Sequence, residues 1–178
     1  GIAMGAPIWL FSFTNEYLEL IRVFGPDILL VLPVTRAPIL NLLEPPPGVR
    51  PLDWVGYLKV PFRDCFWLRN GTINELADAI LTLYRRAGVL EGGNAGCFPT
   101  LWDLRAYLSS LKSGVRTRQA GFLESLQNRL DNMLTFMGEA LCARRSVAPE
   151  VLLGRSVLFQ LGGLTETLLD FFINLILI

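Results

Sequence analysis

Three short apolar runs, widely separated along the chain, constrain its fold more than any other feature. They lie within residues 8–13, 28–32 and 155–161 and consist mainly of aliphatic and aromatic side chains. A continuous apolar run of this length is typical of a strand buried on both faces, as strands in parallel sheets are. The first two runs flank residues 16–24, which have apolar residues at helical spacing and a Gly-Pro pair after them. This order predicts a strand–helix–strand unit of a parallel sheet, with a third strand near residue 157.

A proline-rich segment, Pro38 to Pro51, follows the second predicted strand and contains three consecutive prolines at 45–47. Proline fixes φ and removes a backbone donor, so this segment favours extended backbone over helix. We interpret it as a rigid spacer between two parts of the fold, because the flanking Leu42 and Leu43 are expected to be anchored in a core. A ligand for an SH3-type domain is the alternative.

The residues after the spacer show the period of amphipathic helices. The first predicted helix covers residues 53–68, and Pro61 is expected to kink or split it. Thr72-x-x-Glu75 is expected to cap a second helix and Thr100-x-x-Asp103 a third. A longer helix with an apolar stripe covers Phe122 to Met137. We interpret these stripes as core surface.

The expected fold is one α/β domain that is predominantly helical, with about three core strands. Residues 1–40 are expected to form a partial strand–helix–strand core, 41–153 a helical insertion, and 154–178 a returning strand and helix. Thr165 is expected to cap that last helix.

The C-terminal run, Leu168 to Ile178, is apolar except for Asp170 and Asn174. It is too short to span a bilayer, which takes about 20 apolar residues, so we expect no membrane span. An apolar terminal segment normally packs beneath another element. We therefore infer that the chain is a piece of a longer one, and that residues 171–178 self-associate where they are left uncovered.

The residue types present exclude most catalytic sites. The chain contains no histidine, so a Ser-His-Asp triad, a Cys–His dyad and a histidine-containing zinc site cannot be built from it. Cys65, Cys97 and Cys142 show no Cys-x-x-Cys pairing, and we interpret them as reduced thiols of a cytoplasmic protein. Neither lysine, Lys59 or Lys112, follows a glycine run, as the lysine of a phosphate-binding loop does. We therefore expect no complete ATP site and assign no catalytic, cofactor-binding or metal-binding residue.

Two charged features are candidates for contact with a partner. The segment from Lys112 to Arg118 is basic, through Lys112, Arg116 and Arg118, and lies between two predicted helices, where it could touch phosphates. An ordinary solvated connector is the alternative, and the net charge of zero argues against nucleic-acid binding through bulk charge. Glu16 and Glu19 share one face of a predicted helix, and a solvated surface is the plainer interpretation of that pair.

Several segments match, in order, the landmarks of one protein family. Residues 11–17, Phe-Ser-Phe-Thr-Asn-Glu-Tyr, and 25–33, Gly-Pro-Asp-Ile-Leu-Leu-Val-Leu-Pro, resemble the strand–helix–strand that follows the phosphate-binding loop in HerA/FtsK-type P-loop ATPases. Glu16-Tyr17 match the end of that family's Phe-Asp-x-x-Gly-Glu-Tyr motif, whereas Ser12 replaces its aspartate and Asn15 its glycine. Further stretches resemble the helical insertion and the strand after it: Asn41 to Gly48 with Trp54, Phe98 to Leu104, Leu126 to Leu130, and Gly154 to Leu161.

The resemblance implies a hexameric, ATP-driven motor that acts on DNA, since the family includes DNA translocases and the ATPases of conjugative secretion. This chain would be the middle of such a motor, beginning after the phosphate-binding loop and stopping before the strand that carries the magnesium-binding and catalytic acids. By itself this chain would be inactive. The longer parent would bind ATP and Mg²⁺, and the remainder of the parent chain would be the partner of this segment. Glu16 would lie near the edge of the core strands, and Lys112, Arg116 and Arg118 would face DNA or a neighbouring subunit.

Two other classes of function stay open at this point. A stand-alone helical adaptor module would use an exposed apolar surface to bind a protein partner, and a small enzyme with carboxylate-based chemistry is the third candidate. The reading frame on either side separates them, because a Gly-x-x-Gly-x-Gly-Lys-Ser/Thr run upstream favours the motor.

Overall fold

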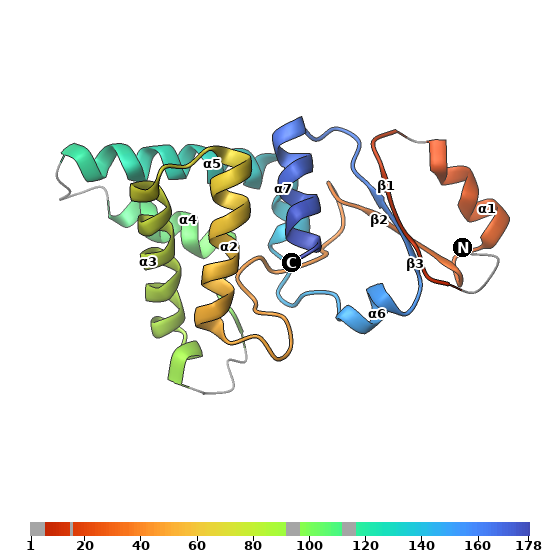
Figure 1. The fold of residues 1–178 in the computed structure, drawn as a ribbon, viewed down its shortest axis with the longest axis horizontal. Coiled ribbons are helices and arrows are strands. Elements are labelled where there is room, and N and C mark those ends of the chain that lie inside the picture. Colours follow the sequence, from red (N-terminus) through yellow and green to blue (C-terminus); the bar gives the residue numbers. More distant parts are fainter. Residues whose placement is uncertain (1–5, 15, 92–96, 112–116) are drawn as a thin grey trace.

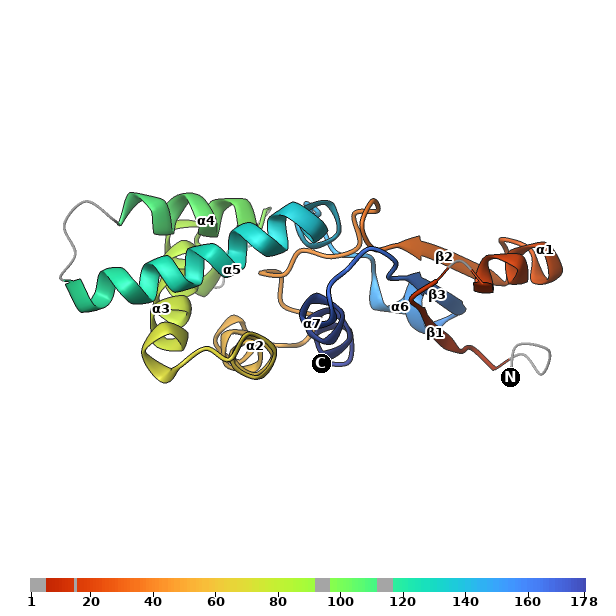
Figure 2. The same cartoon turned by 90° about the horizontal axis from the view of Figure 1, so that it is seen from above.

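The computed structural model describes residues 6–14, 16–91, 97–111 and 117–178. The chain forms an elongated molecule with a small sheet at one end and a group of helices at the other (Figure 1). One further helix lies between these two parts in both side and top views (Figures 1 and 2). The expected helix-rich α/β fold is confirmed, and both ends of the sequence contribute strands to the sheet.

The described strands form one parallel sheet: β1 (Trp9–Ser12), β2 (Leu29–Pro33) and β3 (Ser156–Gln160). Their order across the sheet is β1-β3-β2, so the last strand in the sequence is the central one. Phe159 of β3 pairs with Phe11 on one side and with Leu32 on the other. The three expected strands are therefore present, and β3 joins the two N-terminal strands, which do not pair with each other.

One face of the sheet packs against α7 (Glu166–Ile176). The Phe159 ring lies on this face, where the Phe172 ring of α7 meets it edge to face with 5.8 Å between the ring centroids. Phe11 stacks on the same ring at 5.1 Å. This face belongs to the main apolar core of the molecule.

The opposite face is covered by a short 3-10 turn, η2 (Glu16–Glu19), and by α1 (Leu20–Phe24), which ends at Gly25 with a positive φ of 75°. Because side chains alternate along a strand, Leu29 and Leu158 point to this side, where both are buried. Figure 1 shows α1 and α7 on opposite sides of the sheet. The short helix expected between the first two strands is thus present, although its first part is a 3-10 turn.

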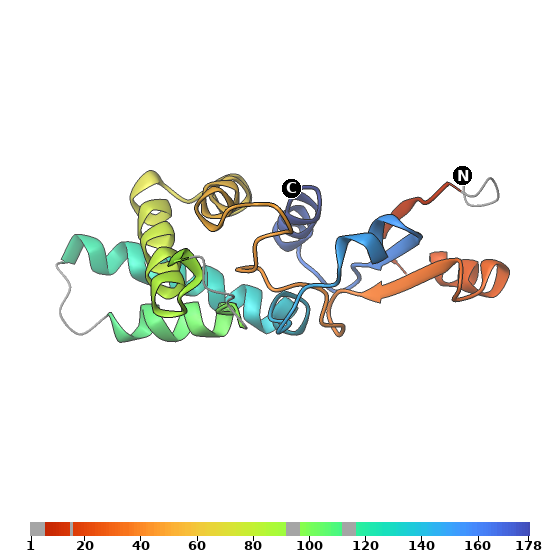
Figure 3. The ribbon, with the colours of Figure 1, turned by 90° about the horizontal axis from the view of Figure 1, so that it is seen from below.

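Helices α2 to α5 form the group at the far end: α2 (Pro51–Phe66), α3 (Asn70–Arg86), α4 (Leu101–Ser110) and α5 (Thr117–Leu141). α3 packs against α2, α4 and α5, and α2 contacts α7 (Figure 3). Two short elements that the sequence did not predict are η3 (Val89–Glu91), a 3-10 turn after α3, and α6 (Pro149–Leu153), which precedes β3.

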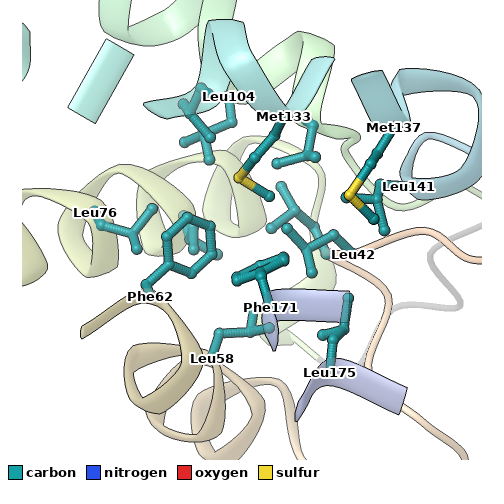
Figure 4. Packing of buried hydrophobic residues seen from close by; sticks show 14 of the residues in the cluster. Leu42, Leu58, Phe62, Leu76, Leu104, Met133, Met137, Leu141, Phe171 and Leu175 are labelled. Atoms are coloured by element: carbon teal, nitrogen blue, oxygen red, sulfur yellow. The ribbon is translucent and has the colours of Figure 1, made fainter. Parts of the chain in front are cut away.

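A continuous apolar core runs from these helices through α7 to the sheet. The ring of Phe171 lies 5.0 Å from that of Phe62 and 5.1 Å from that of Phe66, so α7 is packed tightly against α2. Figure 4 shows this region, where side chains of α7 meet those of α2, α3 and α5. Leu42 and Leu43 are fully buried in the same core, so the flank of the proline-rich segment is anchored as expected.

The same packing covers most of residues 171–178 within the chain, and self-association through the part left uncovered stays a prediction. Phe171 and Phe172 are fully buried and Leu175 is 5% exposed, because α7 buries its apolar face within the chain itself. The apolar residues of this segment that remain exposed are Leu177 and Ile178, and the polar Asn174 is exposed as well. Among the described residues, none of the helices combines the length and apolar character that crossing a membrane requires.

Pro61 does not split its helix. α2 runs without interruption from Pro51 to Phe66 with Pro61 inside it. Proline in a helix interior costs about 3 kcal/mol through a lost hydrogen bond and a steric clash. Pro61 is itself buried between the fully buried Leu58 and Phe62, and the packing of this face against the core offsets that cost.

The predicted helix starts were right in one case and wrong in another. Thr100 and Asp103 form the expected capping box at the start of α4. Thr72 and Glu75 do not, because α3 already begins at Asn70. A Cβ on Gly71 would lie 2.6 Å from the Phe122 ring, so the first turn of α3 is packed closely against α5. The side chain of Thr165, at the N-cap of α7, makes no capping hydrogen bond to a described group.

Candidate functional site

The carboxyl ends of the strands form one edge of the sheet, which is where ligands bind in open α/β sheets. At the end of β1 the buried Ser12 hydroxyl donates to the Thr14 carbonyl oxygen at 2.5 Å. The Leu161 N–H donates to the Ser12 carbonyl at 2.7 Å, and the Val34 N–H donates to the Gln160 carbonyl at 3.0 Å. The side chain that stands at the position of the family's aspartate therefore holds the turn after β1.

Glu16, the predicted acidic residue near the core edge, lies in the first turn of η2 with its side chain exposed. Glu19 forms an ion pair with Arg22, with 2.9 Å between Oε2 and Nη1, at the surface. The two carboxylates are thus part of a solvated helix face. Across the described parts of the chain, no group of three or more His, Cys, Asp or Glu side chains is arranged to hold a metal ion.

The described residues at this edge do not by themselves fit Mg-ATP. Such a site takes a lysine and free backbone N–H groups for the phosphates, and a hydroxyl or acid for the metal. The hydroxyl of Ser12 is already engaged, and Glu16 is a single exposed carboxylate. Lys59 lies in α2, within the helical part of the molecule. We therefore assign no chemical step to this edge.

The predicted basic contact falls largely outside the described residues. Lys112 and Arg116 belong to the undescribed stretch between α4 and α5, and Arg118 lies in the first turn of α5 without a described side chain. The end of α4 and the start of α5 both lie at the end of the molecule away from the sheet (Figure 2). Contact of these three residues with DNA or with a neighbouring subunit stays a prediction.

A groove of about 800 Å³ lies between the sheet and the helical part of the molecule. We call it the Trp9–Trp54 groove, because both indoles line it. Three segments far apart in the sequence supply the rest of its walls, namely residues 39–47, residues 145–153 with α6, and residues 175–178 at the end of α7. Most of the lining side chains are apolar, so the groove suits an apolar occupant.

Hydrogen bonds fix the walls of this groove. The Trp9 Nε1–H donates to the Leu152 carbonyl at 2.8 Å, which ties α6 to the start of the sheet. The Trp54 Nε1–H donates to the Leu42 carbonyl at 3.0 Å, which ties the proline-rich segment to α2. Residues 39–42 also pair with the end of α5, through bonds that include Leu42 N–H to the Leu141 carbonyl at 3.1 Å. Hydrogen bonds within the chain therefore hold the walls of the groove together.

Asn41 is a buried polar residue at the wall of the groove. Its backbone N–H donates to Ser146 Oγ at 3.0 Å, and its Oδ1 accepts from the Leu43 N–H at 3.0 Å. The side chain is 99% buried, and its Nδ2 donates to no group among the described residues. Since nearly all buried polar groups in native proteins are hydrogen-bonded, this nitrogen is an exception among the described residues.

Cys142, which forms a β-bridge with Asn41, does not add a nucleophile. Burial raises the pKa of its thiol to about 11. Because the thiolate is the reactive form of cysteine, this side chain is unreactive at neutral pH. All three cysteines are free thiols in the structure.

Sequence reasoning did not find the groove, because its walls come from three distant segments. A single signal was present, the lone amide of Asn41 within the apolar stretch Ile39-Leu40-Asn41-Leu42-Leu43. A polar side chain at such a position is expected to be buried and to require partners.

No protein-family model matches the sequence, and no curated protein matches it significantly. Solved structures do match. They include VirB4 of Thermoanaerobacter pseudethanolicus, with a TM-score of 0.69 and 17% sequence identity, over 98% of this chain and 68% of that one. At this identity the similarity concerns the fold. The chain thus shares, over nearly its whole length, the fold of a part of VirB4, which is the kind of fold that the resemblance to HerA/FtsK-type ATPases implied.

Proposed function

We propose that this chain is the central part of a HerA/FtsK-type P-loop ATPase that moves DNA in a transfer process of the conjugative type. The similarity to VirB4, a P-loop ATPase of conjugative transfer, over 98% of the chain is the observation that carries this proposal. The ordered motifs of the sequence support it independently, because they depend on the residues and their spacing and not on the fold.

In this proposal residues 1–40 and 154–178 are parts of the ATPase core, and residues 41–153 are an insertion between its strands. The remainder of the parent chain supplies the phosphate-binding loop, the acidic residues and the Mg-ATP site, and the parent acts as a hexamer in the cytoplasm. The chain alone is inactive. The described residues at the sheet edge formed by Ser12 and Gln160 do not fit Mg-ATP. This is compatible with a nucleotide site in the remainder of the parent chain.

Calorimetric titration of the 178-residue chain with Mg-ATP tests whether the nucleotide site lies outside this chain. We expect no heat of binding, and micromolar binding would contradict the proposal that the nucleotide site lies elsewhere. The parent, expressed from the complete reading frame, is expected to hydrolyse ATP faster in the presence of DNA. A parent without ATPase activity, or without a phosphate-binding loop upstream of this segment, would refute the motor function.

The basic segment is proposed to contact DNA in the parent. Replacing Arg116 and Arg118 with alanine is expected to weaken DNA binding and to reduce the slope of log K against log salt by about two, one per lost phosphate contact. The matched control replaces Arg85 and Arg129, two exposed arginines elsewhere on the helices, and should leave the slope unchanged. Equal slopes for both double variants would exclude this contact.

A stand-alone adaptor is the second candidate, and the Trp9–Trp54 groove is the observation that favours it. The two functions differ in what surrounds the segment in its gene. A reading frame limited to this chain would favour the adaptor, whereas an upstream phosphate-binding loop with a downstream strand ending in acidic residues would favour the motor.

A further inference from the structure

The end of α2 carries a tryptophan in an unfavourable conformation. Among the residues that the structure describes, Trp67 is the one non-glycine residue with a positive φ, 53°, and its side chain is 88% exposed. A positive φ is an outlier for a bulky side chain, and glycine is the usual residue where a helix ends in this conformation. The exposed indole gains little from burial in return.

The turn at this position has a structural reason, whereas the indole has none. The turn brings the next residue, Leu68, into the core, where it is 5% exposed. Glycine would make the same turn without strain. Within the described part of the chain the Trp67 Nε1–H donates to no group, unlike those of Trp9 and Trp54, which donate to backbone carbonyls. An exposed, unanchored ring on a strained backbone therefore points to contact with a partner.

The surroundings of Trp67 are basic. Arg63 lies one helical turn before it and Arg69 two residues after it, and both are exposed. Asp64 is the one acidic residue between Lys59 and Arg69, and it pairs with Arg63, with 2.7 Å between Nε and Oδ1. With three basic side chains and one acidic one, this stretch has a net charge of +2. Cations beside an exposed ring suit a ligand with negative charges and flat aromatic groups, which is a nucleic acid.

The same corner of the molecule includes the start of α5. A Cβ on Gly71 would lie 2.6 Å from the Phe122 ring, and Gln119 Nε2 donates to Glu75 Oε2 at 3.1 Å. Both contacts join the first turns of α3 to those of α5. Gln119 directly follows Arg118, the last residue of the basic segment for which contact with DNA is proposed. The connection between α2 and α3 thus lies at the end of α5 that adjoins this segment.

We infer that Trp67 stacks on a base of single-stranded DNA and that Arg63 and Arg69 bind the neighbouring phosphates. An indole stacks on a base only where the face of that base is free, as it is in a single strand and not inside a duplex. The inference rests on the proposed function, under which the parent moves DNA. It adds the form of the DNA and the residues that bind it.

Anisotropy of a fluorescein-labelled 20-nucleotide oligothymidylate, titrated with the parent, tests the contact. Trp67→Ala is expected to weaken binding about 10-fold through the loss of stacking. Trp102→Ala is the matched control and should leave the affinity unchanged, because Trp102 is 55% exposed but is followed by Asp103 and shares a hollow with Glu139. Equal affinities of the native parent and Trp67→Ala, or equal losses in the two variants, would overturn the inference. No binding by the native parent would do the same.

The salt dependence of this binding separates the ring from the charges. Trp67→Ala removes no charge and should leave the slope of log K against log salt unchanged. Arg69→Ala should reduce the slope by about 0.7, the value for one phosphate contact on a single strand. A duplex of the same length should bind the native parent and Trp67→Ala equally. A changed slope for Trp67→Ala, an unchanged slope for Arg69→Ala, or an equal loss on duplex would contradict these roles.

Trp67→Gly separates binding from folding. Glycine adopts a positive φ without strain, so this variant is expected to raise the melting temperature of the 178-residue chain by about 2–4 °C. In the parent the same variant should weaken oligonucleotide binding as much as Trp67→Ala does. A lower melting temperature would show that the indole supports the fold, and would overturn the inference.

The inference and the proposed function fail in different ways. A parent that has the phosphate-binding loop and DNA-dependent ATPase activity, but binds the oligonucleotide equally well with and without Trp67, refutes the stacking alone. A parent without that loop or activity refutes the proposed function, whatever the effect of Trp67→Ala.

Discussion

The two faces of the sheet are packed to very different degrees. On the α7 side, Phe159 is fully buried beneath Phe172, and this contact continues into the core of the helical part. On the α1 side, none of residues 16–24, all of them described, is buried, and Phe13 and Tyr17 are 55% and 45% exposed. We call these the closed side and the open side. The difference indicates that the helical part and α7 form a folding unit, whereas η2 and α1 are held to the sheet by few buried contacts.

The largest expected effect is the loss of an aromatic ring from the closed side. Phe171→Ala removes a fully buried ring that contacts Phe62 and Phe66, so we expect a loss of about 3–5 kcal/mol in the free energy of unfolding. Phe24→Ala makes the same change in α1, where the ring is half-buried, and should cost about 1 kcal/mol. Urea unfolding measures both. Equal losses would mean that the two sides are packed equally well.

Phe171→Leu keeps the first comparison measurable where the alanine variant does not fold. It retains most of the apolar volume and is expected to lose less free energy than Phe171→Ala, but more than Phe24→Leu.

The second prediction tests how tightly the helical part of the closed side is packed. Gly71→Ala would place a Cβ 2.6 Å from the Phe122 ring, and the resulting overpacking should cost about 1–3 kcal/mol. Gly56→Ala in α2 meets nothing within 4 Å, so the gain in helix propensity should stabilise the chain by about 0.5–1 kcal/mol. Opposite signs for the two changes in urea unfolding support the contact. A stabilising Gly71→Ala would contradict it.

This contact also shows why part of the fold escapes sequence reasoning. The apolar runs were sufficient to predict the strands, because a short continuous apolar run is a local signature, although only β3 is buried along most of its length. The start of α3 was mispredicted: the helix begins at Asn70, before the expected cap, and its first turn packs against α5, a helix distant in the sequence. The strand order has the same origin, since the pairing of β3 with both β1 and β2 is long-range.

The candidate sites also differ in whether their residues are close together or far apart in the sequence. Ser12 and Glu16 were located by a motif, which is local, and the structure adds only that the Ser12 hydroxyl binds the turn after its strand. The groove around Asn41 needs three segments and could not be assembled from any one of them. The one local sign of the groove was Asn41, a polar side chain within an apolar run. The segments that surround Asn41 are set by tertiary packing.

The third prediction compares two tyrosine hydroxyls. Tyr84 is fully buried on the closed side, and its hydroxyl donates to the Leu43 carbonyl at 2.7 Å. Tyr84→Phe leaves that carbonyl without this donor and should cost about 1–2 kcal/mol in unfolding free energy. Tyr17→Phe, on the open side, removes an exposed hydroxyl and should change stability by less than about 0.5 kcal/mol. Similar small changes for both would show that Leu43 is held by apolar packing alone.

The last prediction concerns the pH dependence that the buried thiol of Cys142 gives to the closed side, an effect that is absent at neutral pH. Burial raises its pKa from 9.0 to about 11, so the folded chain holds this proton more tightly than the unfolded chain does. The resulting stabilisation is complete below pH 9 and is lost as the pH rises toward 11. We therefore expect the free energy of unfolding of the native chain to fall more steeply over this interval than that of Cys142→Ala. Cys97, which is exposed, provides the control, because Cys97→Ala should follow the native pH profile. If Cys142→Ala also followed that profile, the thiol would be accessible to water. The region where the end of α5 meets Asn41 would then be packed as loosely as the open side.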